Sequence, residues 1–320
     1  MSKIFITRKI DDAVIAELKA SFDVEVWDSE EVAVPRDVLL KHAKECDALL
    51  TMLSDQVDEE LLSVAPHLKV VANMAVGYDN VDVEAADKAG VIITNTPDVL
   101  TDTTADLVFA LMLATARRIP EAADFIRQGE WTSWSPYLLA GRDVHHKTIG
   151  IIGMGKIGQA VAKRAAGFDM NILYHTRSRK TEAEKEFGAQ YKNLHDLLEK
   201  SDFVLVLAPL TEETRGMIGY EQFRQMKKSA IFLNVGRGPV TDEEALIEAL
   251  KNDEIAGAGL DVFEKEPISP DHPLLSMKNV VAVPHIGSAS EETRYAMMKL
   301  AADNIKSVLE NGRPLTKVSL

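Results

Sequence analysis

Short apolar runs alternate along the chain with segments in which apolar residues recur every three or four positions. The short runs predict β-strands, and the periodic segments at residues 11–22, 35–46 and 81–90 predict helices with one apolar face. In the first third of the chain, the predicted strands are residues 3–7, 24–27, 48–52, 70–73 and 91–95. Strands that alternate with single helices form a parallel sheet with right-handed crossovers.

The alternation pauses after residue 100 and then resumes. Residues 105–118 are apolar over too long a run for a strand and predict a buried helix, which Thr101 or Thr103 caps and which ends near Pro120. A last helix at residues 291–311 should close at Gly312. Further strands are predicted at residues 148–152, 171–175, 203–208, 230–234, 259–262 and 280–283. The predicted fold class is α/β, with two doubly wound parallel-sheet domains of flavodoxin or Rossmann type.

Composition narrows the functional classes. The chain has 320 residues, of which 46% are hydrophobic and 27% charged, as is typical of a globular protein with two domains. Its net charge of −14 argues against nucleic acid or an anionic membrane as a partner. One cysteine, Cys46, excludes an intrachain disulfide and favours a reducing compartment. Without a signal peptide or a membrane-length apolar run, the chain is expected to be cytoplasmic, and we expect no metal site.

Three glycines lie between a predicted strand and a predicted helix. Gly153, Gly155 and Gly158 have the spacing of a dinucleotide-binding turn, after a strand at residues 147–152 and before a helix at residues 159–168. The first glycine permits the sharp bend, the second lets pyrophosphate approach the backbone, and the third lets helix and strand pack closely. An ordinary glycine-rich turn is the alternative, but the strand–turn–helix context favours a nucleotide site.

The end of the following strand bears on which nucleotide binds. An acidic residue there usually holds the ribose hydroxyls of NAD, whereas this chain has Thr176, Arg177, Ser178, Arg179 and Lys180. A neutral residue followed by basic ones suits the 2′-phosphate of NADP. We therefore expect NADP(H) to be preferred, with NAD(H) also possible. A solvated basic loop is the alternative interpretation.

Three more motifs accompany the glycine turn: NVGRGPVTDEEAL at residues 234–246, GAGLDVFEKEP at 257–267 and PHIGSAS at 284–290. In this order and spacing, the four motifs resemble the D-isomer-specific 2-hydroxyacid dehydrogenases over essentially the whole chain. Within that family, the stretches TMLSDQVDEELL, LTDTTADLVFALMLATARR and GEWTSWSPYLLAGRDV are most similar to the glyoxylate/hydroxypyruvate reductases.

The resemblance implies a domain organisation. A substrate-binding domain would comprise residues 1–99 and 291–320, a dinucleotide-binding Rossmann domain would comprise residues 100–290, and the cleft would lie between them. The resemblance also implies a homodimer, with Trp131 and Trp134 in a segment that we expect at the subunit contact. Plain core packing is the alternative role for these tryptophans.

Arg237, Glu266 and His285 are the catalytic set that the resemblance implies, and their chemistry suits it. The Arg237 guanidinium can hold the carboxylate of a 2-oxo acid by two parallel hydrogen bonds. A protonated His285 can donate to the carbonyl oxygen while a hydride reaches the carbonyl carbon. A carboxylate bonded to the imidazole orients it and favours its charged form. Glu264 competes with Glu266 for this role, and only the resemblance separates the two.

The resemblance also implies binding residues. Those for the substrate are Leu53, Ser54, Val76, Gly77 and Arg237, with the N–H groups of Val76 and Gly77 directed at the carboxylate. Those for the cofactor are Thr104, Gly153, Gly155, Lys156, Ile157, Gly158, Thr176, Arg177, Ser178, Arg179, Lys180, Pro209, Thr214, Val235, Gly236, Asp261, His285 and Gly287. Helix capping is an alternative role for Thr104 and for Asp261.

The expected activity is NADPH-preferring reduction of glyoxylate or hydroxypyruvate to the D-2-hydroxy acid. Two positions depart from the family pattern: Thr176 replaces the aspartate of NAD-type members, and Asp106 replaces a glutamate, with little consequence expected. The alternatives are reduction of 2-ketogluconate and, in another class, a nucleotide-sensing binding protein like the C-terminal binding protein corepressors. Glu266 argues against a formate-dehydrogenase-type relative, which has glutamine there. The end at Leu320 argues against a long phosphoglycerate dehydrogenase.

Overall fold

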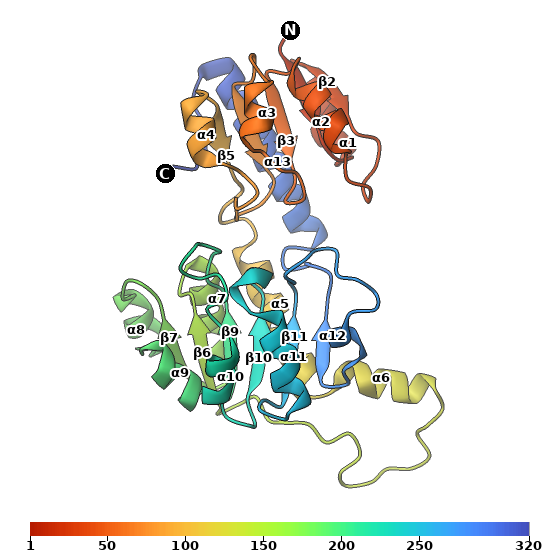
Figure 1. The fold of residues 1–320 in the computed structure, drawn as a ribbon, viewed down its shortest axis with the longest axis vertical. Helices are drawn as coiled ribbons and strands as arrows, with labels where there is room; N and C mark the ends of the chain where they lie inside the picture. The colour runs from red at the N-terminus through yellow and green to blue at the C-terminus, as the bar shows by residue number, and fades with distance from the viewer. Residues whose placement is uncertain (320) are drawn as a thin grey trace. The chain divides into compact units, whose positions relative to one another are not determined.

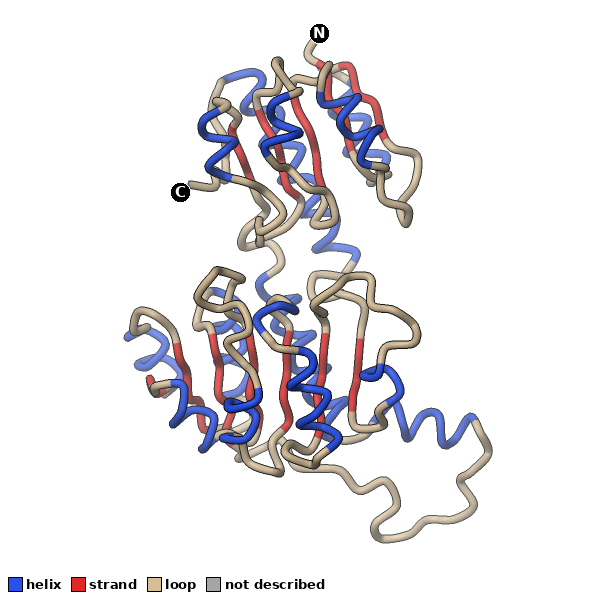
Figure 2. The backbone as a smooth tube through the Cα atoms, viewed as in Figure 1, coloured by secondary structure: helices blue, strands red, loops and turns tan. Residues whose placement is uncertain are grey.

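A computed structural model describes residues 1–319 of the chain. The chain forms two compact units, each built on its own parallel sheet (Figure 2). Unit 1 comprises Met1–Leu100 and Ala289–Leu320, and unit 2 comprises Thr101–Ser288. The predicted domains were 1–99 with 291–320, and 100–290. The substrate-binding and dinucleotide-binding roles given to them stay predictions.

Unit 1 contains a five-stranded sheet with the strand order β2-β1-β3-β4-β5, all parallel. Its strands are β1 (Lys3–Ile6), β2 (Asp23–Val26), β3 (Ala48–Thr51), β4 (Val70–Asn73) and β5 (Ile92–Thr94). Its helices are α1 (Asp12–Lys19), α2 (Arg36–Ala43), α3 (Glu59–Ser63), α4 (Val83–Lys88) and α13 (Glu291–Asn311). The order reverses between β1 and β3, and ligands of such sheets bind at the carboxyl ends of the strands at that point.

Local chemistry explains where the helices of unit 1 begin and end. The side chains of Asp58 and Asp82 accept hydrogen bonds from the N–H groups of the first turns of α3 and α4, which satisfies donors that a helix leaves unpaired. Ser290 caps α13 in the same way. That helix closes at Gly312 in a left-handed conformation (φ 68°), as predicted.

Unit 2 contains a seven-stranded parallel sheet with the order β12-β11-β10-β9-β6-β7-β8. Its strands are β6 (Thr148–Ile152), β7 (Asn171–His175), β8 (Gln190–Tyr191), β9 (Phe203–Val206), β10 (Ile231–Asn234), β11 (Gly257–Leu260) and β12 (Val280–Ala282). Its helices are α5 (Thr101–Ala116), α6 (Ile119–Arg127), α7 (Lys156–Ala166), α8 (Thr181–Phe187), α9 (Leu194–Lys200), α10 (Tyr220–Gln225), the 3₁₀ helix η1 (Gly238–Val240), α11 (Glu243–Lys251) and α12 (Pro273–Ser276). The order reverses between β6 and β9, which is the Rossmann arrangement.

Helices cover both faces of the unit 2 sheet (Figure 1). Because successive side chains of a strand point to opposite faces, Ile231 and Leu233 of β10 join an apolar cluster with α5 and α7. Phe232, between them, joins a second cluster with α10 and α11. A strand buried on both faces must be apolar throughout, which accounts for the unbroken apolar runs in the sequence.

Most predicted strands correspond to observed ones, with ends shifted by a few residues. The largest shift is in β11, which spans Gly257–Leu260 and not residues 259–262. The prediction that Thr101 or Thr103 caps the long helix is wrong, because α5 already begins at Thr101. That helix ends at Ala116, before Pro120. Arg118 then adopts a left-handed backbone (φ 54°), and Pro120 lies in the first turn of α6, where a proline needs no N–H partner.

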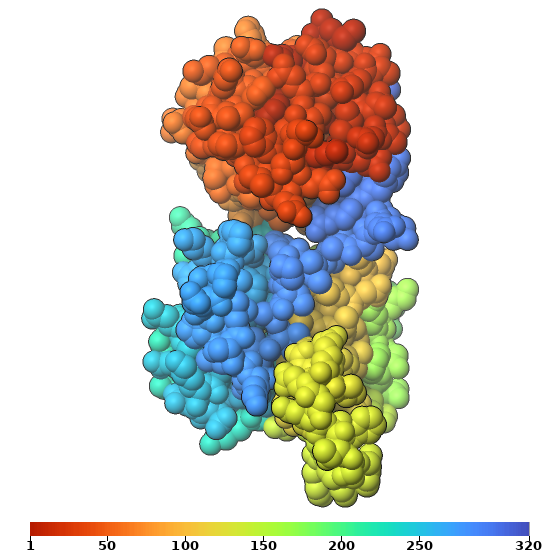
Figure 3. Space-filling view, turned by 90° about the vertical axis from the view of Figure 1, so that its right-hand side faces the viewer, coloured from red at the N-terminus to blue at the C-terminus, as the bar shows by residue number. Residues whose placement is uncertain are grey.

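Residues 128–147 join α6 to β6 without regular secondary structure. This segment, yellow-green in Figure 3, projects from the surface of unit 2. A groove of about 1090 Å³ lies beside it, lined by α6, by residues 140–142 and by the amino ends of β10, β11 and β12. Ligands of parallel sheets bind at the opposite, carboxyl edge, so this groove is not the candidate active site.

None of the helices within residues 1–319 is both long and apolar enough to cross a membrane.

Candidate active site

The glycine turn joins β6 to α7 at the reversal point of the unit 2 sheet. Gly153 has a φ of 107°, and a Cβ on it would stand 2.7 Å from the backbone of Leu207 and Ala208. A Cβ on Gly158 would stand 2.4 Å from the carbonyl oxygen of Gly153. Side chains are therefore excluded at both positions, as predicted for the first and third glycines.

The second glycine meets open space. A Cβ on Gly155 would have no atom of the protein within 4 Å, and no side chain caps α7 at this residue. The first turn of α7 holds Lys156 and Ile157, and its amino end is the positive end of the helix dipole, which attracts an anion. These residues fit the pyrophosphate of a dinucleotide.

Arg237 lies in the turn that follows β10, and a buried amide shapes this turn. Asn234, 1% exposed, accepts from the Gly236 N–H (3.1 Å) and donates to the carbonyl oxygen of Arg237 (3.1 Å). Gly238 packs so closely that a Cβ there would lie 1.8 Å from the carbonyl oxygen of Phe263. The backbone at Phe263 therefore fixes the position of Arg237 and Gly238. Val235 and Gly236 lie at the same end of β10.

His285 and Glu266 form the central pair of the site. Nδ1 of His285 lies 2.7 Å from Oε2 of Glu266, and Oε1 of Glu266 accepts from the Phe263 N–H at 3.0 Å. Burial acts to raise the pKa of Glu266, but the hydrogen bond from His285, the charges of His285 and Arg237, and the Phe263 N–H together lower it. Glu266 is therefore a carboxylate that orients the imidazole and leaves Nε2 for another partner. The carboxylate of Glu264 makes no bond to His285, and the backbone N–H of Glu264 donates to the carboxylate of Glu243.

Asp261 directly follows β11 and holds the turn that carries His285. Its two carboxylate oxygens accept from the N–H groups of Ile286 (2.6 Å) and Gly287 (2.9 Å), and its carbonyl oxygen accepts from the His285 N–H (2.9 Å). Burial raises the pKa of Asp261 to about 6, although the two N–H donors and the charge of His285 act to lower it. Asp261 thus caps a turn and not a helix.

Thr104 is brought to the same place from α5. It is 5% exposed, and its side chain lies 3.4 Å from the position that a Cβ on Gly287 would take. Thr104, Gly287 and Asp261 therefore form one contact group beside His285. Pro209 and Thr214 lie on the loop after β9, where the Thr214 hydroxyl donates to the Pro209 carbonyl oxygen at 2.7 Å.

The basic turn after β7 carries the residues predicted to select the nucleotide. Thr176 and Lys180 are half-buried, whereas Arg177, Ser178 and Arg179 are exposed. Arg179 makes a two-point ion pair with Glu184 of α8. The acid expected for ribose binding is thus replaced by a turn with three basic side chains.

The four substrate contacts predicted in unit 1 lie on two neighbouring strand-end loops. Leu53 and Ser54 follow β3, and Val76 and Gly77 follow β4. Within residues 1–319, the N–H groups of Val76 and Gly77 have no hydrogen-bond acceptor. These two groups are therefore free to bind an anion, and their role as donors to the substrate carboxylate stays a prediction.

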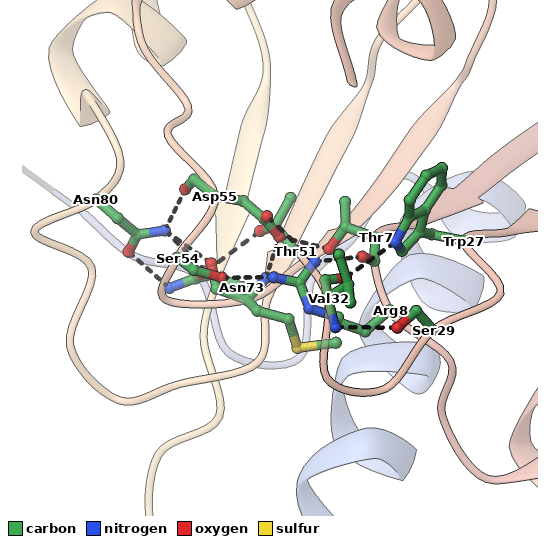
Figure 4. A network of polar contacts seen from close by, with 11 residues as sticks. Thr7, Arg8, Trp27, Ser29, Val32, Thr51, Ser54, Asp55, Asn73 and Asn80 are labelled. Carbon is green, nitrogen blue, oxygen red and sulfur yellow. Dashed lines mark hydrogen bonds and ion pairs between the residues drawn. The ribbon is translucent and has the colours of Figure 1, made fainter. Parts of the chain in front are cut away.

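Two buried amides tie these loops together (Figure 4). Asn80 Nδ2 donates to the carbonyl oxygens of Met52 (3.2 Å) and Asp55 (2.8 Å), on the loop after β3. Asn73 Nδ2 donates to the carbonyl oxygen of Gly77 (3.1 Å) and to Oδ1 of Asn80 (3.2 Å). Asn73 is 0% and Asn80 is 6% exposed. The hydrogen bonds that hold both loops are therefore shielded from water.

A buried charged pair lies on the other side of the same loop (Figure 4). Arg8 follows β1 and donates to the Ser54 hydroxyl oxygen at 2.9 Å, and its Nη1 lies 3.7 Å from Asp55. Burial raises the pKa of Asp55, although the Thr7 hydroxyl and the Met52 N–H, which donate to it, and the charge of Arg8 act to lower it. Since Ser54 accepts from Arg8, its own O–H stays available to donate to a ligand.

The residues that support the site carry no distinctive signal in the sequence. Asn73, Asn80 and Asn234 each stand at or near a strand end, and asparagine is a common turn residue, so nothing in their spacing singled them out. Arg8 and Asp55 look like surface charges in the sequence and are buried in the structure. Within the described residues, no group of three His, Cys, Asp or Glu side chains is arranged to hold a metal ion.

Comparison with known proteins gives one family. Residues 109–287 match the family described as D-isomer specific 2-hydroxyacid dehydrogenase, NAD binding domain. A glyoxylate reductase from Thermococcus kodakarensis is 54% identical over 321 residues, which cover 99% of this chain and 96% of the relative. A glyoxylate reductase from Pyrococcus horikoshii is 53% identical with the same coverage of 99% and 96%.

A solved structure is similar over both units. It is an NADPH-dependent glyoxylate/hydroxypyruvate reductase from Sinorhizobium meliloti in complex with NADP and malonate. The TM-score is 0.86 at 36% identity, and the match covers 99% of this chain and 97% of that one.

Proposed function

The chain belongs to the D-isomer-specific 2-hydroxyacid dehydrogenases, a family of oxidoreductases, and from this premise we propose that it reduces glyoxylate or hydroxypyruvate, with NADPH preferred over NADH. The products would be glycolate or D-glycerate. The observation that carries the proposal is the His285–Glu266 pair, 2.7 Å apart, at the strand ends beside Arg237. The relatives named glyoxylate reductase support the choice of a short 2-oxo acid.

The residues of the site divide the chemistry among them. Arg237 binds and orients the substrate carboxylate by two parallel hydrogen bonds. When bound, the nicotinamide cofactor supplies the hydride that reaches the carbonyl carbon. His285, protonated and oriented by Glu266, donates a proton from Nε2 to the carbonyl oxygen, so that the 2-oxo acid becomes a 2-hydroxy acid. On unit 1, the N–H groups of Val76 and Gly77 are two further donors for an anion.

The cofactor assignment rests on two features of unit 2. The amino end of α7, which no side chain caps, suits the pyrophosphate of either nucleotide. The basic turn at Thr176–Lys180 lacks the ribose-binding acid and supports NADPH, as does the NADP bound to the related Sinorhizobium meliloti structure.

We also propose a cytoplasmic homodimer. Segment 119–138 exposes large apolar side chains beside the groove on unit 2, which a second copy of the chain would cover. A reducing compartment suits the single cysteine, Cys46, which is fully buried and whose thiol pKa is raised to about 12 by burial.

Initial rates test the proposed function. NADPH and NADH consumption is measured with glyoxylate, hydroxypyruvate and 2-ketogluconate, for the wild type and for His285→Ala. We expect the highest kcat/KM with NADPH and a short 2-oxo acid, and a loss of about 10²- to 10⁴-fold in the variant, because general acid catalysis contributes that much. Faster turnover with NADH would overturn the preference for NADPH. Faster turnover with 2-ketogluconate would make that longer 2-oxo acid the substrate. Tight cofactor binding without turnover of any substrate would favour a nucleotide sensor.

A further inference from the structure

Residues 263–272, the Glu266 loop, lie between β11 and α12 in unit 2. Two consecutive N–H groups at the start of this loop donate to two different carboxylates. The Phe263 N–H donates to Oε1 of Glu266 at 3.0 Å, and the Glu264 N–H donates to Oε1 of Glu243 at 2.5 Å. Glu266 belongs to the loop and faces the active site, whereas Glu243 lies in the first turn of α11. The backbone of the loop is therefore attached to a helix outside it.

Glu243 also contacts the far end of the Glu266 loop. Its Oε2 lies 3.4 Å from Nε2 of His272, the last residue of the loop. Nδ1 of His272 accepts from the Leu274 N–H at 3.4 Å, which places the ring hydrogen of a neutral imidazole on Nε2. That hydrogen faces Glu243, so the contact needs no charge on the ring. One carboxylate thus joins the two ends of the loop.

The helix that carries Glu243 is itself fixed in the core of unit 2. The Asp242 side chain caps α11 by accepting from the Ala245 N–H at 3.0 Å. Leu246 of α11 and Phe263 of the loop belong to the same buried apolar cluster. The Glu243 side chain is only 13% exposed, so its contacts are better shielded from water than those of an exposed ion pair. Glu243 is therefore suited to hold the loop in one place.

We propose that Glu243, together with His272, is a positioning residue of the active site: it joins both ends of the Glu266 loop and so holds the Glu266 carboxylate against Nδ1 of His285. Glu243 acts through the loop and not on the reacting atoms. The kinetic consequence rests on the proposed function, whereas the effect on the bond between Glu266 and His285 does not.

Steady-state kinetics with NADPH and glyoxylate test the kinetic consequence. Glu243→Ala should lower kcat by about 10- to 100-fold, because misplacing a catalytic group by about 1 Å costs up to about 10²-fold, and should leave KM for NADPH unchanged. The alkaline limb of kcat/KM should move to lower pH, since a carboxylate that has moved away no longer favours the charged imidazole. Glu243→Gln keeps an oxygen for the Glu264 N–H and should restore most of kcat. His272→Ala also keeps that bond and should lower kcat less than Glu243→Ala.

A double-mutant cycle separates positioning from a general loosening of unit 2. If Glu243 acts through Glu266, then Glu243→Ala should lower kcat no further once Glu266→Ala is present. Glu244→Ala is the matched control, because Glu244 is an exposed acid in the same first turn of α11, so both variants remove one charge from the same helix end. We expect Glu244→Ala to have the kcat and the pH profile of the wild type. Should Glu243→Ala not fold, His272→Ala takes its place in the cycle.

The hydrogen bond between His285 and Glu266 can be followed without turnover. A proton held between an imidazole and a carboxylate exchanges slowly with water and gives a separate low-field NMR signal, which His285→Gln identifies. We expect this signal in the wild type, in Glu243→Gln and in Glu244→Ala, and its loss in Glu243→Ala.

Each outcome bears on one of the two proposals. If no 2-oxo acid is reduced but Glu243→Ala loses the signal, the proposed function is wrong and the positioning role stands. If the wild type turns over and Glu243→Ala keeps both kcat and the signal, the proposed function stands and this inference is overturned. An equal loss of kcat from Glu243→Ala with and without Glu266, or a wild type that lacks the signal, would overturn it as well.

Discussion

His285 adopts a backbone conformation that a non-glycine residue rarely takes. Its φ is 51°, in the left-handed region, which costs roughly 1–2 kcal/mol for such a residue. The bonds from the His285, Ile286 and Gly287 N–H groups to Asp261 offset this cost. The direction of the imidazole is therefore set by Asp261 behind it and by Glu266 beside it.

The raised pKa of Asp261 predicts how the stability of the protein changes with pH. Folding raises this pKa from 3.8 to about 6, so between these values the folded state holds a proton that the unfolded state has lost. The stabilising contribution of the protonated group is fully present below pH 3.8 and is lost as the pH rises through about 6. Asp261→Asn should remove this decline, which amounts to at most about 3 kcal/mol at 1.36 kcal/mol per pKa unit.

Urea unfolding of the wild type and Asp261→Asn at a series of pH values between 4 and 7 measures this difference. Glu264→Gln is the control, because Glu264 is an exposed acid of the same loop and does not contact His285. A constant difference between wild type and Asp261→Asn across this range would show that Asp261 does not titrate there.

At the scale of elements, the loops after β3 and β4 are held together by Asn73 and Asn80. Their buried amides satisfy the carbonyl groups of Gly77 and Asp55, for which the loops supply no other donor. The free N–H groups of Val76 and Gly77 are presented by these same loops. Loss of either amide should therefore loosen these loops and raise KM for the substrate.

Asn80→Ala should lower the free energy of unfolding by about 1–3 kcal/mol, because it leaves the Asp55 carbonyl group unsatisfied, whereas the Met52 carbonyl keeps the Asp55 N–H. In the folded fraction, we expect KM for glyoxylate to rise while KM for NADPH stays the same, since the residues proposed to bind the cofactor lie in unit 2. Denaturant unfolding and steady-state kinetics measure the two effects. Gln56→Ala, an exposed amide in the same loop, is the control, and an equal change in both KM values would exclude a local role for Asn80.

At the scale of the whole molecule, one segment exposes an unusual amount of apolar surface. The exposed side chains are Ile119 (52%), Ile126 (60%), Trp131 (57%), Trp134 (78%) and Tyr137 (88%). The groove of about 1090 Å³ adjoins α6 of this segment. Large exposed apolar side chains gathered in one segment are typical of protein interfaces, which supports the proposed dimer contact.

A dimer that uses this segment should dissociate when its aromatic side chains are removed. We expect sedimentation at micromolar concentration to give twice the chain mass for the wild type and a shift toward the monomer for Trp134→Ala/Tyr137→Ala, because aromatic anchors dominate interface energies. Tyr220→Ala, on a 37% exposed tyrosine of α10, is the control. A monomeric wild type, or a variant that stays dimeric, would contradict this assignment.

The amino-acid sequence is sufficient to predict the α/β class, nearly all of the strands, the glycine turn and the catalytic candidates. These features depend on local periodicity, on backbone freedom at Gly153 and Gly158, and on motifs within single turns, all of which neighbouring residues encode. Tertiary structure decided what depends on contacts between distant residues. It distinguished Glu266 from Glu264 as the partner of His285, and buried Arg8 and Asp55 from surface charges. Residues of the same type in one loop differ only in what the fold places beside them, and that neighbour sets their charge, their orientation and their role.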